Sequence, residues 1–240
     1  MSRLGSNRMG EIRFLCAEAL RPAMDPLIIQ FQEAADQEVA VGYANVGTIA
    51  DRLRKGEVAD LAVVSPEQWE HLRQDGLLLP TVRAPLARIG IAVAVKAGAA
   101  KPDIGSIAAL KQALLGARSI AIIDPAKGSP SGVRALKLFE QLGIATKLRS
   151  KIKLVEMSED VFKVLASGEM DIGINQASEV AASPEVESAG ALPSDVQQYT
   201  VFVVGIPTTG RHAAAAGKLV EFLLSPPAAA LFNTKEIEVA

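Results

Sequence analysis

Two hydrophobic patterns alternate along this chain, and each predicts a different kind of element. Short apolar runs rich in valine, isoleucine and alanine predict buried strands at 12–16, 39–43, 59–65, 87–95, 119–123, 152–155, 171–175 and 201–206. Between them, apolar residues recur at helical spacing and predict helices over 24–35, 48–55, 66–72, 133–142, 159–166, 211–223 and 227–232. Such alternation indicates βαβ units, parallel sheets and an α/β fold. The run at 87–95 is apolar on both faces, as expected of a strand inside a parallel sheet.

Capping residues mark several of the predicted helix starts. Asp25-Pro26 and Ser65-Pro66 each combine a capping side chain with a proline that suits the first helical turn. The first helix can therefore begin as late as Asp25. Ser106 has the same capping chemistry, and it predicts a further helix directly after it.

Composition limits the class of protein. The chain has 240 residues, of which 49% are hydrophobic and 22% charged, which is the profile of a folded globular protein. Its formal net charge of −2 gives no general support for a nucleic-acid partner. The longest apolar stretch, 89–95, is much shorter than the roughly 20 residues of a membrane-spanning helix, so we expect no membrane insertion. The single cysteine, Cys16, excludes an intramolecular disulfide and a multi-cysteine metal site.

Catalytic signatures are missing from the sequence. The segment 128–132 resembles a nucleophile elbow only superficially, because Pro130 occupies the position that needs the serine. The two histidines, His71 and His212, have no motif partner and suit surface or capping positions. HExxH, Walker and GxGxxG patterns do not occur. We therefore expect a protein that is not an enzyme and that needs no cofactor or metal. We also expect it to be a monomer.

A basic stripe is predicted near the middle of the chain. Its residues alternate, so that on a strand all of them would lie on one face: Lys147, Arg149, Lys151 and Lys153. Such a stripe could dock an acidic partner, or it could protect an exposed sheet edge from aggregation.

Loops rich in small or polar residues follow several predicted strands, at 17–20, 44–48, 127–132 and 157–161. In open α/β sheets, ligands bind beyond the carboxyl ends of the strands, where helices begin. A helix start offers unpaired backbone N–H groups and about half a positive charge, so converging helix starts can hold an anion without Arg or Lys. Further donors would come from side chains: Asn45, Thr48, Ser129 and Ser131.

Taken together, these segments resemble the type II periplasmic solute-binding proteins, and most closely the molybdate- and tungstate-binding components of ABC importers. The resemblance covers about 12–232. Its most specific part is Asp124-Pro125 followed by Ser129-Pro130-Ser131-Gly132, which is similar to the Asp-Pro…Pro-Ala-Gly loop whose backbone N–H groups hold the oxyanion in that family.

Other segments extend the resemblance. The run 59–65 is similar to the family's Ala-Asp-Val-Phe-Ile-Ser strand, and Val161 lies at the helix start where the family uses a valine N–H. Gly173-Ile174-Asn175-Gln176 lies where the family often has Gly-Ile-Val-Tyr, with the tyrosine as a ligand. The loops and the resemblance together predict this ligand-binding set: Ala17, Glu18, Ala19, Asn45, Val46, Gly47, Thr48, Ser129, Pro130, Ser131, Gly132, Val161, Asn175 and Gln176.

Three of the family's usual side-chain donors are replaced here. The first loop, Ala-Ala-Ser-Leu in the family, is one residue longer, carries Glu18 and lacks a hydroxyl. The second loop, 44–48, is not serine-rich, and Gln176 replaces the tyrosine. A carboxylate about 4–6 Å from a bound dianion would repel it by several kcal/mol. An inward-facing Glu18 therefore favours a ligand with a cationic or hydrogen-bond-donating group, whereas a solvated Glu18 would only favour the helix dipole.

The resemblance implies two Rossmann-like lobes joined by a two-strand hinge, with crossovers near 86–89 and 197–201. Lobe 1 would comprise 10–86 and 200–240, and lobe 2 would comprise 87–199. We expect residues 1–9 to be disordered or to be a leader added for expression, because Met9-Gly10 directly precedes the first strand.

The implied function is the capture of a small ligand, expected to be an oxyanion of the molybdate class, in an interlobe cleft for an ABC permease in the periplasm. The N-terminus has Arg3 and Arg8 but no apolar core behind them, so it does not read as a signal peptide. Either an export signal has been removed or the protein is cytoplasmic. The alternative is therefore a cytosolic ligand-sensing module with the same fold that binds a different small organic molecule.

Overall fold

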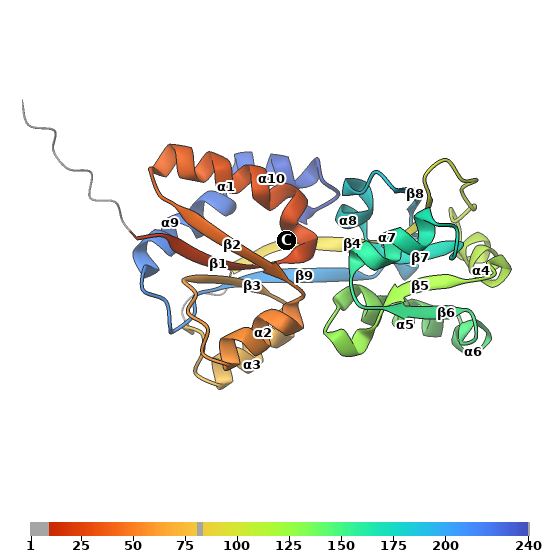
Figure 1. Ribbon diagram of the computed structural model, residues 1–240, viewed down its shortest axis with the longest axis horizontal. Helices are drawn as coiled ribbons and strands as arrows, with labels where there is room; N and C mark the ends of the chain where they lie inside the picture. Colours follow the sequence, from red (N-terminus) through yellow and green to blue (C-terminus); the bar gives the residue numbers. More distant parts are fainter. Residues whose placement is uncertain (1–9, 81–83, 240) are drawn as a thin grey trace, which may run out of the picture.

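A computed structural model of the protein describes residues 10–80 and 84–239. The prediction for residues 1–9 lies outside the described residues. Two α/β lobes lie side by side, and the long strands β4 (Ala84–Lys96) and β9 (Tyr199–Gly205) pass between them (Figure 1). The predicted two-lobed α/β fold is confirmed. The N-terminal and C-terminal elements form lobe 1, and the middle of the chain forms lobe 2.

Lobe 1 is a six-stranded part of the sheet with the order β2-β1-β3-β9-β4-β10. Its other strands are β1 (Ile12–Ala17), β2 (Val39–Ala44), β3 (Leu61–Val64) and β10 (Glu238–Val239). β1 runs parallel to β2 and β3. One face is covered by α1 (Arg21–Ala35), α9 (Ala213–Leu223) and α10 (Pro226–Asn233), and the other by α2 (Val46–Arg54) and α3 (Pro66–Gln74).

Lobe 2 continues the sheet with the order β4-β7-β5-β6, and β8 also pairs with β4. Its strands are β5 (Ile120–Ile123), β6 (Ile152–Val155), β7 (Ile172–Gln176) and β8 (Val186–Ala191). One face carries α4 (Ile107–Gly116), α5 (Pro130–Gln141) and α6 (Ala145–Leu148), and the other carries α7 (Ser158–Ala166) and α8 (Ala177–Ala182). Short 3₁₀ helices complete the chain: η1 (Glu18–Leu20), η2 (Pro125–Lys127) and η3 (Ser194–Val196).

The direction of the connecting strands corrects one prediction. β4 is antiparallel to each of its partners, β7, β8, β9 and β10, so the run at 87–95 does not lie in a parallel pairing. Apolar residues on both faces report burial on both sides, and they carry no information about the direction of the neighbouring strands. β4 leaves lobe 1 while β9 returns to it, which requires the two to run in opposite directions.

Several helices begin earlier than the periodicity predicts. α1 begins at Arg21 with Pro22 in its first turn, and Pro26 lies inside the helix, so a start at Asp25 is wrong. α2 and α5 begin at Val46 and Pro130, so segments predicted as loops are first helical turns. A first helical turn built from glycine, proline and serine shows no apolar periodicity, so the sequence pattern does not reveal it. The predicted caps Ser65 and Ser106 are confirmed, since their hydroxyls accept from Gln68 N at 3.3 Å and Ala109 N at 3.1 Å.

The predicted basic stripe does not form as a single strand face. Lys147 lies in the short helix α6, and β6 begins only at Ile152. Lys151 turns back and donates to the carbonyl oxygens of Leu115 at 2.6 Å and Ala117 at 2.8 Å. The alternating charges therefore span a helix, a turn and a strand.

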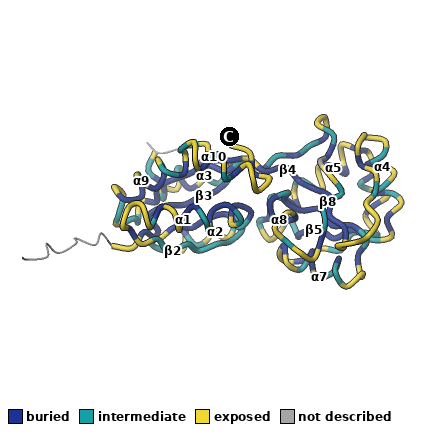
Figure 2. The backbone as a smooth tube through the Cα atoms, turned by 90° about the horizontal axis from the view of Figure 1, so that it is seen from above, coloured by how far each residue is buried: buried dark blue, intermediate teal, exposed yellow. Residues whose placement is uncertain are grey.

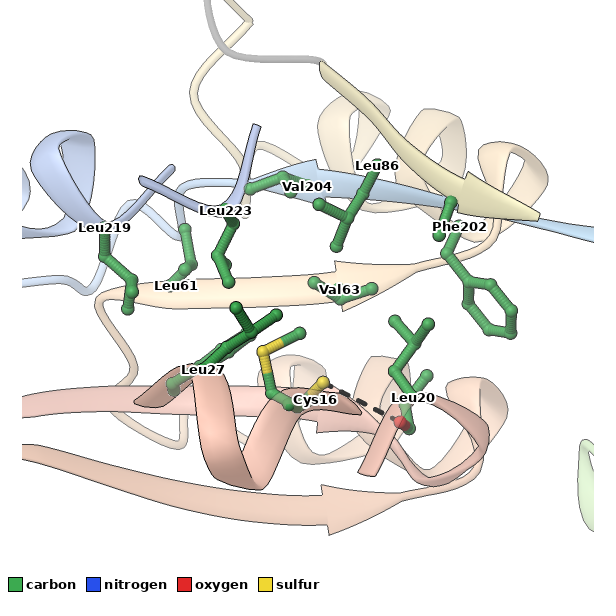
Figure 3. Packing of buried hydrophobic residues seen from close by; sticks show 14 of the residues in the cluster. Cys16, Leu20, Leu27, Leu61, Val63, Leu86, Phe202, Val204, Leu219 and Leu223 are labelled. Atoms are coloured by element: carbon green, nitrogen blue, oxygen red, sulfur yellow. Dashed lines mark hydrogen bonds between the residues drawn. The ribbon is translucent and has the colours of Figure 1, made fainter. Parts of the chain in front are cut away.

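The core of lobe 1 is built by α1, β3, β9 and α9. Leu27 of α1 points toward β3, which carries Leu61 and Val63, and Leu219 and Leu223 of α9 belong to the same cluster (Figure 3). Buried strands run through the middle of each lobe, with exposed helices and loops outside them (Figure 2). Within 10–80 and 84–239, no single helix has the length and apolar character to cross a membrane. Helices α9 and α10 have that length and character only when taken together, and the pair is bent by 60°.

Asp60 ties three segments of lobe 1 together. Its side chain is 1% exposed, and its Oδ2 accepts from the backbone N–H of Arg13 at 2.9 Å. Its Oδ1 accepts from the N–H groups of Arg211 at 2.6 Å and His212 at 2.8 Å, just before α9. A carboxylate that satisfies three backbone donors is a structural group, because its lone pairs are used and water is excluded.

We expect Asp60→Ala to lower the free energy of unfolding by about 3 kcal/mol, because it leaves buried N–H donors without acceptors. Chemical denaturation of the purified variant measures this. Asp103→Ala is the matched control, since Asp103 is exposed and, of the described residues, accepts from Gly105 N alone, at 2.9 Å. Equal losses for the two variants would contradict the structural role of Asp60.

Candidate functional site

A small cavity lies between the two lobes. Lobe 1 contributes Ala17, Glu18, Ala19, Ala44, Asn45, Val46 and Phe202, and lobe 2 contributes Ile123, Ser129, Pro130, Ser131, Gln176 and Glu179. We call it the inner cavity. Its volume is about 20 Å³, which is enough for about one ordered water molecule. The lobes therefore stand close together around it.

Helix starts from both lobes reach the inner cavity. Asn45 precedes α2 and Ser129 precedes α5, and among the described residues neither start has a side-chain cap. The buried hydroxyls of Ser129 and Ser131 instead bond to each other at 3.0 Å. First-turn N–H groups without an intramolecular acceptor carry a partial positive charge. Of the described residues that line the cavity, none is Lys or Arg, so backbone dipoles supply its positive potential.

Close contacts among the described residues hold the lobes against each other. A Cβ atom built on Gly47 of lobe 1 would lie 2.9 Å from the Cα of Gly128 in lobe 2, so only a residue without a side chain permits this approach. Elsewhere, the hydroxyl of Ser178 in α8 donates to the carbonyl oxygen of Ala19 in η1 at 2.6 Å. The arrangement is therefore a closed one.

Each lobe also places a carboxylate on the cavity wall. Glu18 is half-buried and pairs with Arg21 at 3.1 Å, so it is not a freely solvated residue. Burial raises the pKa of Glu18, Arg21 opposes that change, and the charges of Glu159 and Asp25 add to it. Of the two alternatives for Glu18, solvated or facing inward, the geometry favours the inward one, because Glu18 lines the inner cavity.

Glu179 of α8 is the second carboxylate, and no motif or periodicity in the sequence indicated it. Burial raises its pKa to about 7, even though the hydroxyl of Ser158 donates to its Oε1 at 2.7 Å. The charges of Glu18 and Glu159 raise the pKa further, and Arg21 lowers it. Near neutral pH, this carboxyl can therefore accept or donate a proton.

Gln176 presents an unused acceptor. The side chain is 2% exposed, and its Nε2 donates to the hydroxyl of Thr200 at 2.8 Å. Its Oε1 accepts no hydrogen bond from any described residue. The neighbouring Asn175 accepts from Gln176 N at 2.9 Å through Oδ1, while its Nδ2 has no partner in the described part of the chain. Buried polar atoms without partners are rare in proteins and often mark a place for water or a ligand.

Two larger spaces adjoin the inner cavity through shared wall residues. The first, which we call the outer cavity, has a volume of about 450 Å³ and shares Glu18 and Glu179 with the inner one. The second, the side opening, has a volume of about 250 Å³ and shares Val46, Ser129 and Pro130. The carboxylates thus border one space, and the helix starts border the other.

Most of the predicted ligand-binding residues meet at the inner cavity: Ala17, Glu18, Ala19, Asn45, Val46, Ser129, Pro130, Ser131 and Gln176. Their role in binding stays a prediction. The remaining predicted residues do not line it. Thr48 is exposed on α2, Val161 is buried against Gly173, and Gly132 packs its Cα against the carbonyl oxygen of Ile123. Gly47 lies at the lobe contact, and Asn175 is fully buried and does not line the cavity.

Sequence reasoning missed Ile123, Glu179 and Phe202, and it named Ala44 within the loop 44–48 but not as a binding residue. Ala44 and Ile123 end strands, and that position alone could have indicated them. Glu179 lies in α8, for which no helix was predicted. Of the residues that the structure describes, no group of three or more His, Cys, Asp or Glu side chains could hold a metal ion.

Known proteins match this chain over most of its length. The family model described as bacterial extracellular solute-binding protein matches residues 12–235. Aconitate isomerase of a Pseudomonas species is 32% identical over 182 residues, which are 75% of this chain and 68% of that protein. The molybdate-binding protein ModA of Escherichia coli K12 is 24% identical over 226 residues, which are 93% of this chain and 87% of that protein.

A solved structure gives the same picture of the fold. The periplasmic molybdate-binding protein of Azotobacter vinelandii superimposes with a TM-score of 0.80 at 21% sequence identity. The superposition covers 95% of this chain and 99% of that one. At this identity, the likeness describes the fold and not the ligand.

We expect Gly47→Ala to hold the lobes apart, because the new Cβ would meet Gly128. Small-angle X-ray scattering should show a larger radius of gyration than that of the unchanged protein. Gly217→Ala in α9 is the matched control, since a Cβ there meets no atom within 4 Å. It should leave the scattering unchanged and stabilise α9 by roughly 0.5–1 kcal/mol. Identical scattering for both variants would show that the Gly47 contact does not control closure.

Proposed function

This chain belongs to the family of bacterial extracellular solute-binding proteins, and on that premise we propose that it captures a small anionic solute between its lobes for an ABC-type permease. The anion is an oxyanion of the molybdate class or a carboxylate group. The observation that carries the proposal is the meeting of the uncapped starts of α2 and α5 in one cavity with the buried hydroxyls of Ser129 and Ser131. Backbone N–H groups at helix starts bind such anions without a basic side chain.

The permease would recognise the closed state of the lobes. The two strands β4 and β9 provide the proposed hinge, at 86–89 and 197–201. Ile89 belongs to the core of lobe 1 and Ile91 to the core of lobe 2, so β4 passes between the cores within a few residues. A ligand that bonds to both helix starts favours the closed state, because only there do both sets of donors reach it. We propose that the protein acts in the periplasm as a monomer.

The charged side chains at the inner cavity limit which anions can bind there. Protonated Glu179 can donate a hydrogen bond to an anion, whereas ionised Glu179 repels it. Its raised pKa, about 7, means that the site is more receptive to an anion at mildly acidic than at alkaline pH. The carboxylate of Glu18 is partly neutralised by Arg21 at 3.1 Å.

We expect at least one of molybdate, tungstate, sulfate, phosphate or a small carboxylate to raise the melting temperature of the protein. A ligand at a hundredfold excess over its Kd stabilises the folded state by about 2.7 kcal/mol. Affinity for an anion without a cationic group should fall roughly fivefold between pH 6 and pH 8, as Glu179 ionises, when the bound anion raises that pKa by about one unit. Differential scanning fluorimetry measures the melting temperature, and isothermal titration calorimetry measures the affinity at each pH.

Ser131→Ala removes a buried hydroxyl from the inner cavity and should weaken binding of the same anion by roughly tenfold. Ser188→Ala is a control outside this cavity. If none of these anions stabilises the protein at any pH in that range, the proposed anion site is wrong.

A second candidate function, catalysis of isomerisation, is favoured by Glu179. A relative at 32% identity is an aconitate isomerase. Interconverting isomers of an unsaturated acid requires a group that takes a proton from one carbon and returns it to another, with no net change in atoms. A carboxyl with a pKa of about 7 at a cavity wall suits that exchange, because general acid–base catalysis is most efficient when the pKa lies near the working pH.

Incubation of the protein with cis-aconitate in deuterated buffer tests this candidate. Nuclear magnetic resonance should show the trans isomer and deuterium incorporation with the unchanged protein, and a loss of at least a hundredfold with Glu179→Gln. Glu185→Gln is the matched control, because Glu185 lines the outer cavity but not the inner one. Conversion no faster than in buffer alone would exclude the isomerase function for this substrate.

A further inference from the structure

The wall of the inner cavity has two chemically different regions. Ser129 and Pro130, at the start of α5, connect it to the side opening, and this region offers donors. Glu18 and Glu179 connect it to the outer cavity, and this region offers carboxylate acceptors from both lobes. A simple anion uses the first region only and leaves two carboxylates beside it.

The second region has more acidic than basic side chains around it. The charged residues that line the two cavities are Glu18, Arg21, Glu159, Lys163, Glu179 and Glu185. Arg21 is held by Glu18 at 3.1 Å and lies over the ring of Tyr43 with its Cζ 4.4 Å from the centroid. Lys163 lies 3.7 Å from Asp160 on its own helix. Both basic side chains are therefore already engaged, and Glu179 has no cationic partner in the described part of the chain.

Gln176 adds an independent observation. It lines the inner cavity, is 2% exposed and has an Oε1 that accepts no hydrogen bond from the described residues. A buried carbonyl oxygen without a donor is costly, so the site favours a ligand that brings one. The two carboxylates make the same demand, and they prefer a donor that carries positive charge.

We propose that the natural ligand is a small zwitterion, an aliphatic α-amino acid or a close analogue of one. Its carboxylate binds at the starts of α2 and α5, and its ammonium group binds between Glu18, Glu179 and Gln176 Oε1. Together these two groups exceed the present inner-cavity volume of about 20 Å³, so the lobes open to admit the ligand and close around it less tightly than in the present arrangement. Its side chain lies in the outer cavity, whose wall includes the apolar residues Pro22, Phe162, Ala182 and Pro184. This inference rests on the proposed function, because the carboxylate uses the anion site described above.

The two ligand classes respond to pH in opposite ways. An ammonium group beside Glu179 favours the ionised carboxylate and lowers its pKa, so binding releases a proton and strengthens as the pH rises through 7. An anion without an ammonium group favours the protonated carboxyl, so its binding weakens over the same range. Glu18, Glu159, Arg21, Lys163 and Glu185 also act on this region, but burial of Glu179 is the largest contribution to its raised pKa.

Matched ligand pairs test the inference with the full chain. We would titrate L-valine against 3-methylbutanoate and L-leucine against 4-methylpentanoate by calorimetry at pH 6, 7 and 8. Each pair differs in the amino group alone. The inference expects each amino acid to bind at least tenfold more tightly than its partner at pH 8, with an affinity that rises between pH 6 and 8.

Variants assign the effect to the second region. Glu179→Gln keeps an oxygen that can accept from Ser158. This variant should lose the pH dependence, and the ratio of amino-acid affinity to deaminated-acid affinity should fall at least tenfold. Glu18→Gln should reduce the same preference at a partly exposed position, where the substitution does not threaten the fold. Glu185→Gln, in the outer cavity only, should change it by less than twofold.

The outcomes separate the two proposals. If the deaminated acids or inorganic oxyanions bind as tightly as the amino acids, the zwitterion is wrong and the anion site stands. If amino acids bind but Glu18→Gln and Glu179→Gln leave the preference intact, the ammonium site is wrong. If neither amino acids nor any anion binds, the proposed function itself fails.

Discussion

Antiparallel pairing of β4 with β9 is the constraint on which the rest of the structure depends. β4 pairs with β9 in lobe 1 and then with β7 and β8 in lobe 2, so one strand belongs to both sheets. At the crossing, the side-chain amide of Gln197 donates to the carbonyl oxygen of Ile91 at 3.2 Å and accepts from its N–H at 3.1 Å. This ladder keeps the lobes in register while leaving few residues between their cores. With the lobes held in this way, the helix starts that follow β2 and β5 both reach the inner cavity.

The cleft places partly buried carboxylates beside helix starts that suit an anion, and this pairing determines which ligands it can bind. The starts of α2 and α5 provide positive potential, while Glu18 and Glu179 provide negative charge at the wall shared with the outer cavity. Leaving Glu179 ionised and buried costs free energy that the hydrogen bond from Ser158 does not offset, and the raised pKa of Glu179 expresses that cost. A ligand that carries both signs of charge, or a proton that moves on and off this carboxyl, relieves that cost. The same group therefore connects the zwitterion and the isomerase hypotheses.

Relatives of this chain share its fold more than its cleft. The family match over residues 12–235 and the likeness to molybdate-binding structures confirm the resemblance predicted from the sequence. The side chains that would determine the ligand lie in the loops after the strands, and those are the segments that depart from the molybdate-binding pattern. A fold is determined by a large buried core that tolerates many substitutions, whereas a ligand is determined by a few side chains. Solute-binding proteins and an isomerase can therefore belong to one group of relatives.

The sequence alone determined the α/β alternation, most of the strands, the caps at Ser65 and Ser106, and the loops from which the cleft is built. Each of these depends on short-range periodicity or on capping chemistry that involves neighbours in the chain. Only the tertiary structure decided that β4 runs antiparallel to its partners, that Gly47 meets Gly128, and that Glu179 lies beside Glu18. Each of these joins residues far apart in the chain, so their proximity and the burial that shifts the pKa of Glu179 exist only after the two lobes have packed together.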